Sequence, residues 1–182
     1  HFRLEITYTV TGKTIRTQYQ VTNKETDKKM PYFIGGHPGF NCPLFDDEAY
    51  EDYYLEFEKP ETCTVPKPFP ETGMLDFQDR SSWLKDQKEL DLSYDAVTLD
   101  ELASRSVSLR SRKHDKGLKL DFKEFPNLIV WSTLNKGPFL ALEPWSGLST
   151  SVEEGDHLED KKNVRVLNPA QSDQIGFDME IF

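Results

Sequence analysis

The sequence has little of what a disulfide scaffold, a glycoprotein or a membrane protein requires. Its two cysteines, Cys42 and Cys63, are too few for a disulfide framework and lack the paired spacing of a zinc site, although they leave a single disulfide open. There is no Asn-x-Ser/Thr sequon, and the longest apolar runs, such as 128–131, are too short to span a bilayer. Residues 1–10 also lack the pattern of a signal peptide, so we expect a reducing, cytoplasmic location.

The chain has fewer basic than acidic residues. The chain carries 22 Lys and Arg residues against 32 Asp and Glu residues, which gives a net charge of −10. Such an excess of negative charge repels nucleic-acid phosphates and anionic lipid headgroups. We therefore expect neither a nucleic acid nor a membrane surface as a partner.

Motifs for bound cofactors and metals are missing too. The sequence has no glycine-rich phosphate loop, no His-x-x-x-His spacing, and no serine or cysteine in a nucleophile motif. The acidic stretch 46–58 lacks the ligand spacing of a calcium loop, so a solvated face is the better interpretation of it. The sequence therefore predicts a protein without a metal or a cofactor.

Alternation of apolar and polar residues is the main pattern that is present. Phe2, Leu4, Ile6, Tyr8 and Val10 fall on one face of a strand, and 15–21 alternates in the same way after a turn, which predicts an antiparallel hairpin. Further strands are predicted at 53–57, 96–99, 107–109, 118–122, 128–134, 139–145, 164–167 and 175–182. Turns are expected at 23–29, 66–73, 113–117 and 135–138, and only 79–90 has the character of a short helix. We expect one all-β antiparallel sandwich domain over 1–182.

Glu143 stands in an unusual place in the stretch "FLALEPWSG". Both faces of this strand are apolar, which is typical of a strand at the centre of a covered sheet. Glu143 shares the face of Phe139 and Ala141, where an unpaired carboxylate would be costly. The pattern leaves open a salt-bridged structural glutamate, a strand that emerges into solvent, and a carboxylate that points into a ligand cleft. Pro144 cannot donate to a ladder, so we expect it near a strand end.

His37 stands in the stretch "YFIGGHPGF" between two glycines and a proline. Gly35 and Gly36 permit a positive φ and the close approach of another group, and Pro38 biases His37 toward extended geometry. A turn histidine that only hydrogen-bonds its loop and a functional histidine both fit this pattern. The other three histidines, His1, His114 and His157, lie at the terminus or in polar turns and are expected to be exposed and without a function.

Together, His37 and Glu143 have the chemistry of a general acid and a general base. An ordinary glutamate is ionised at neutral pH and can accept a proton, and a histidine beside a carboxylate can donate one. If these two residues form a site, they should line one cleft. We expect them to face each other across a gap wide enough for a ligand, without direct contact.

Four segments resemble the aldose 1-epimerase, or galactose mutarotase-like, family, and especially its bacterial LacX-like branch. They are "YQVTNKETDKKMPYFIGGHPGFNCPL", "YDAVTLDELASRSVSL", "LIVWSTLNKGPFLALEPWSG" and "LNPAQSDQIGF", and they cover nearly the whole chain in order. The pair "GGHPGF" and "LEPWSG" is the most specific part. The resemblance implies a large antiparallel β-supersandwich that interconverts the α and β anomers of a free hexose without a metal or a cofactor. It is also compatible with a homodimer.

The resemblance also implies roles for individual residues. His37 matches the histidine that protonates the ring oxygen, and Glu143 matches the base that takes the proton of the C1 hydroxyl. Asp95 would match an aspartate that binds sugar hydroxyls. Trp145 could offer an apolar face to the sugar or belong to the core. A sugar-binding protein of the same fold without catalysis, or a sandwich without a ligand, remains an alternative.

The family usually has a further N-terminal portion ahead of the segment that corresponds to "FRLEITYTV". That portion supplies opening strands of the sandwich, together with an arginine and a histidine that contact the sugar. We therefore expect the 182 residues to form the larger, C-terminal part of the family's fold.

Overall fold

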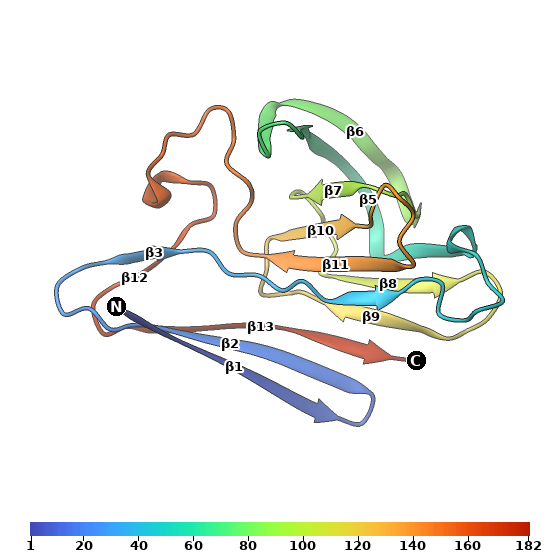
Figure 1. The fold of residues 1–182 in the computed structure, drawn as a ribbon, viewed down its shortest axis with the longest axis horizontal. Coiled ribbons are helices and arrows are strands. Elements are labelled where there is room, and N and C mark those ends of the chain that lie inside the picture. The colour runs from blue at the N-terminus through green and yellow to red at the C-terminus, as the bar shows by residue number, and fades with distance from the viewer.

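The computed structural model describes all residues from 1 to 182, and it is built almost entirely from antiparallel β-strands (Figure 1). The predicted all-β fold is confirmed. The strands are β1 (Phe2–Thr11), β2 (Thr14–Asn23), β3 (Met30–Tyr32), β4 (Gly39–Asn41), β5 (Tyr53–Phe69), β6 (Met74–Asp91), β7 (Ala96–Leu99), β8 (Ser106–Ser111), β9 (Gly117–Asp121), β10 (Asn127–Trp131), β11 (Phe139–Trp145), β12 (Arg165–Leu167) and β13 (Ser172–Ile181). The helical segments are two single 3-10 turns, Tyr50–Asp52 and Leu158–Asp160. No helix has the length and apolarity needed to cross a membrane.

The strands form three sheets. A seven-stranded sheet has the order β1-β2-β13-β9-β8-β5-β6, a four-stranded sheet has the order β4-β11-β10-β7, and β12 pairs with β3. In Figure 1, β1, β2 and β13 run along the lower edge of the molecule, and the long hairpin of β5 and β6 arches over its top. Each strand pair is antiparallel, as the alternating sequence pattern requires.

The hydrophobic core lies between the seven-stranded and the four-stranded sheet. Leu55 and Leu109 contribute to it from one sheet, and Leu128 and Leu140 contribute from the other; all four are fully buried. The position of β11 between β4 and β10 confirms the prediction of a central strand at 139–145. Both cysteines are buried and unpaired, so the disulfide that the sequence left open is not formed.

The hairpin of β5 and β6 differs from the prediction for this region. Residues 79–90, which could have held a turn or two of helix, lie in β6, and β5 continues to Phe69 through the first half of the predicted turn at 66–73. The pairing between β5 and β6 shifts register at several points. Because each bulge interrupts the period of two, the sequence does not show the alternation by which a strand is recognised.

Strand β1 has an uncovered apolar face at the edge of the seven-stranded sheet. Its five apolar residues are all between 44% and 70% exposed: Phe2, Leu4, Ile6, Tyr8 and Val10. The alternation that predicted this strand is therefore correct, but its apolar face does not contribute to the core of these 182 residues.

Candidate active site

The segment that carries His37 lies along β11 and is hydrogen-bonded to it. The N–H of Gly36 donates to the carbonyl of Pro144 at 3.0 Å, and the N–H of Ser146 donates to the carbonyl of Ile34 at 2.9 Å. The segment then continues into β4, whose Gly39 pairs with Ala141. The two stretches that the sequence singled out, 32–40 and 139–147, are therefore neighbours in the folded chain.

Two glycines allow this close approach. A Cβ atom on Gly35 would lie 2.5 Å from Cδ1 of Trp145, and one on Gly36 would lie 2.5 Å from Cε1 of Phe177. Both distances are too short for an alanine unless the neighbouring ring moves. The predicted role of these glycines in close packing is confirmed. They do not provide a positive φ, since the glycines with a positive φ are Gly12 and Gly73 and not Gly35 or Gly36.

Glu143 lies in the middle of β11 on the face of the four-stranded sheet that points away from the core. The neighbouring Leu142 and Leu140 point inward and are fully buried, so period-two alternation places Glu143 outward. Its side chain is nevertheless only 3% exposed. Burial raises the pKa of the Glu143 carboxyl above its ordinary value, while the charge of His37 and the indole of Trp145 offset part of this increase.

His37 and Glu143 are in direct contact. Nε2 of His37 lies 3.2 Å from Oε1 of Glu143, and the imidazole is 57% exposed while the carboxylate is almost fully buried. The expected convergence of the two residues is correct, but the expected gap between them is wrong, and Glu143 is not among the residues that line the pocket beside His37. The physical reason is the buried charge of Glu143, which needs a close polar or charged partner, and His37 provides one.

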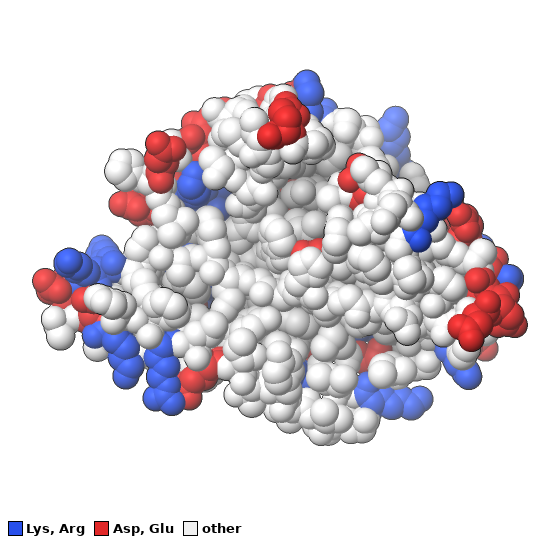
Figure 2. Space-filling view, in the orientation of Figure 1, with Lys and Arg blue, Asp and Glu red and all other residues white.

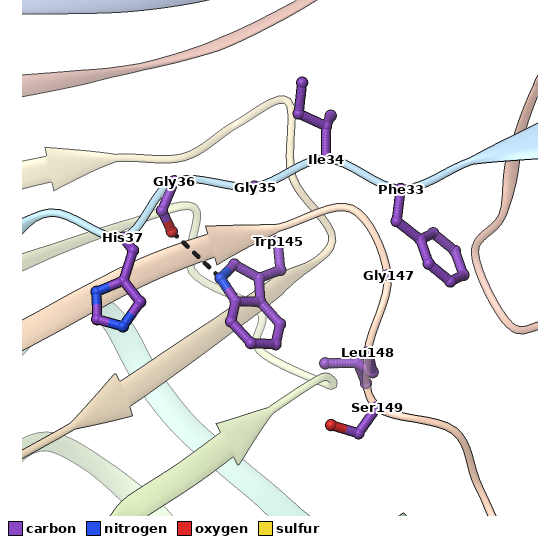
Figure 3. A pocket seen from close by; sticks show the side chains of 9 residues that line it. All are labelled: Phe33, Ile34, Gly35, Gly36, His37, Trp145, Gly147, Leu148 and Ser149. Atoms are coloured by element: carbon purple, nitrogen blue, oxygen red, sulfur yellow. Dashed lines mark hydrogen bonds between the residues drawn. The ribbon is translucent and has the colours of Figure 1, made fainter.

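Trp145 borders a pocket beside this pair. Its indole N–H donates to the carbonyl of Gly36 at 3.2 Å, as the dashed line in Figure 3 shows. The pocket has a volume of about 440 Å³, within the range of small-molecule sites. It is lined by Phe33, Ile34, Gly35, Gly36, His37, Trp145, Gly147, Leu148 and Ser149 (Figure 3).

Asp95 is not brought into contact with His37 and Glu143. It is exposed just before β7, where its carboxylate accepts a hydrogen bond from the N–H of Ala96 at 2.7 Å. Ala96 pairs with Trp131 in the four-stranded sheet, so Asp95 lies at the end of the sheet that carries Trp131.

Trp131 is a residue of this region to which sequence reasoning assigned no role. Its ring centroid lies 5.5 Å from that of His37, with the two planes at 82°. In the sequence, Trp131 is one apolar residue in the strand "LIVWSTL", and no local signal distinguishes it from a core residue.

The environment of His114 also differs from the one that the sequence predicts. The sequence predicts an exposed residue without a function, but the side chain of His114 is only 21% exposed and its Nε2 lies 3.1 Å from the buried carboxylate of Glu48. Glu48 also accepts hydrogen bonds from Tyr53 and Ser111. The acidic stretch 46–58 is therefore not solvated throughout, because Glu48 is turned inward to tie its loop to the seven-stranded sheet.

The antiparallel β-fold described above is that of the galactose mutarotase-like proteins. A galactose mutarotase related enzyme from Lactobacillus acidophilus superimposes with a TM-score of 0.86 at 26% identity, over 100% of this chain and 61% of that one. A galactose mutarotase-like protein from Lactobacillus casei superimposes with a TM-score of 0.84 at 27% identity, over 100% of this chain and 63% of that one.

The chain belongs to the aldose 1-epimerase family, whose sequence pattern it matches over residues 1–165. It is 60% identical over 185 aligned positions to the plasmid-encoded protein LacX of Lactococcus lactis subsp. lactis, and equally to the chromosomal LacX of the same organism. These alignments cover 99% of this chain and 62% of each relative, so the chain spans less than two thirds of their length.

Proposed function

We propose that His37 and Glu143 are the acid and the base of an aldose 1-epimerase, a mutarotase for a free hexose. The observation that carries this proposal is their meeting as an exposed imidazole and a buried carboxylate, 3.2 Å apart, in a chain of the aldose 1-epimerase family. A buried carboxylate with a raised pKa is a stronger base than an exposed one, which suits proton abstraction from a hydroxyl.

The proposed reaction moves two protons and no other group. Glu143 takes the proton of the C1 hydroxyl while the bond between C1 and the ring oxygen breaks. The electron pair of that bond stays on the ring oxygen, which takes a proton from the protonated imidazole of His37. The resulting aldehyde turns about the C1–C2 bond, and the reverse transfers close the ring on its other face and restore both residues. No metal or cofactor takes part in these steps.

A bound substrate would replace the direct contact between His37 and Glu143. The C1 hydroxyl would occupy the place that His37 holds at the Glu143 carboxylate, and the ring oxygen would face the imidazole. The 57% exposure of the His37 side chain leaves room for it to turn toward a ligand. Trp145 would border the sugar on one side, and Asp95 would bind a sugar hydroxyl from the end of the sheet that carries Trp131.

Polarimetry tests the proposal. Freshly dissolved α-galactose and α-glucose should reach their equilibrium rotation faster when the 182-residue chain is added. The same assay should be run on a chimera in which this chain replaces the matching part of the L. lactis LacX protein, because the relatives are longer. Sugar binding without acceleration in either protein would favour a non-catalytic carbohydrate-binding protein, and neither binding nor acceleration would contradict both functions.

A further inference from the structure

The outer face of the four-stranded sheet carries two tryptophans, one toward each end of the paired strands β10 and β11. Trp145 is opposite Asn127, and Trp131 is opposite Ala141. Opposed residues of an antiparallel pair share a face, as do residues two apart along a strand. Glu143 therefore lies between the two tryptophans, roughly 7 Å along the strands from each position.

Trp131 flanks the imidazole of His37 directly. The two rings meet edge to face at 5.5 Å, and the indole also packs against Phe139 at 5.2 Å with an angle of 61°. The indole is only partly buried, so part of its apolar surface is accessible next to the acid–base pair. Figure 2 shows the surface hollowed over β7 and β10, and Trp131 is the last residue of β10.

Trp145 has a different environment. Its N–H is bonded to the carbonyl of Gly36, and its ring packs against Gly35. It lines the pocket of about 440 Å³, to which Trp131 does not contribute. The two tryptophans therefore lie on opposite sides of Glu143 along the strands.

We propose that Trp131 is a second aromatic binding residue of the site and presents its indole face to the C–H surface of a hexopyranose. An aromatic ring stacks favourably on an apolar surface at short range, and a sugar ring offers such a surface on one face. The inference rests on the proposed function for the identity of the ligand. It assigns to Trp131 a contribution to sugar affinity that is separate from the proton transfers at His37 and Glu143.

Three substitutions test the role of Trp131. Trp131→Leu removes the aromatic face, and Trp131→Phe retains a smaller one. Trp83→Leu is the matched control, because Trp83 is 37% exposed in β6 and its neighbour Leu84 points into the core. Sugar affinity is measured by fluorescence titration with galactose, KM and kcat by polarimetry, and folding by thermal melting, in both the 182-residue chain and the chimera.

Trp131→Leu should weaken galactose binding and raise KM about tenfold, with kcat changed by less than about threefold. Trp131→Phe should lie between Trp131→Leu and the parent, and Trp83→Leu should bind like the parent. Parent-like affinity and KM in a folded Trp131→Leu protein would overturn this inference alone. Binding without turnover in the parent would overturn the proposed function but leave the titration as a test of Trp131. No galactose-dependent signal in either parent would contradict both.

Discussion

Glu143 is a carboxylate in a place where ionisation is costly. Its pKa is raised by burial, which means that the folded chain binds the proton of this group more tightly than the unfolded chain does. Ionisation of Glu143 therefore lowers the free energy of unfolding. This destabilisation is fully present at pH values above the raised pKa of the folded chain and absent at pH values below the ordinary pKa of 4.5. The contact with His37 offsets only part of it.

Glu143→Gln should therefore melt at the same or a higher temperature than the parent at pH 7, because glutamine fills the site without a charge. The difference between the two proteins should shrink as the pH falls to about 4, where the parent carboxyl is also neutral. Melting curves at a series of pH values measure this. A clearly lower melting temperature of the variant at pH 7 would instead assign Glu143 a structural role.

Gly35 should not tolerate a side chain. In Gly35→Ala the new methyl group would lie 2.5 Å from the Trp145 ring and 2.9 Å from the carbonyl oxygen of Pro144, which is backbone and cannot turn aside. We expect a loss of about 1–3 kcal/mol in the free energy of unfolding and reduced activity, because the segment of His37 must move away from β11.

Gly39→Ala is the matched control for Gly35→Ala. A Cβ atom on Gly39 meets no atom within 4 Å, although this glycine also pairs with β11. The Gly39→Ala control should match the parent in its free energy of unfolding, measured by chemical denaturation, and in its initial rate. Equal losses in both variants would show that the contact of Gly35 with Trp145 is not what positions His37.

At the scale of elements, regular alternation determined which strands the sequence could predict. β1, β2 and β11 follow a period of two or a continuous apolar run, and each lies where the pattern placed it. β6 does not, because bulges in its pairing with β5 change which residues of the strand face inward. Its strand structure depends on pairing with β5, which is a tertiary effect that no local pattern records.

The uncovered face of β1 gives a prediction for that element. The double variant Ile6→Thr/Val10→Thr should change the free energy of unfolding by no more than about 1 kcal/mol, because both side chains are largely exposed and threonine is favourable in strands. Leu109→Ala, in the core, should cost about 2–5 kcal/mol. Urea denaturation compares them. A loss in the double variant as large as that in Leu109→Ala would show that the β1 face is covered in solution.

At the scale of the whole molecule, Figure 2 shows Lys, Arg, Asp and Glu side chains around the rim of one face and few of them across its centre, where the surface is hollowed. The sequence predicted the sandwich and the convergence of His37 with Glu143, because both follow from strand patterns and from two specific motifs. It did not predict their direct contact or the position of Trp131 beside His37. Both depend on the register of β10 against β11 and on side-chain packing across them, which strand patterns alone do not determine.

The proposed role of Glu143 as the base of a mutarotase is tested by the initial rate of sugar mutarotation in the Glu143→Gln variant. Glutamine has nearly the same shape and still bonds a hydroxyl, but a neutral amide does not accept a proton at neutral pH. The substitution is made in the 182-residue chain or in the chimera, depending on which of them is active. The variant should stay folded and bind galactose, while its initial rate of mutarotation falls by roughly 10²–10⁴-fold. A folded Glu143→Gln protein that epimerises galactose at the parent rate would show that Glu143 is not the base.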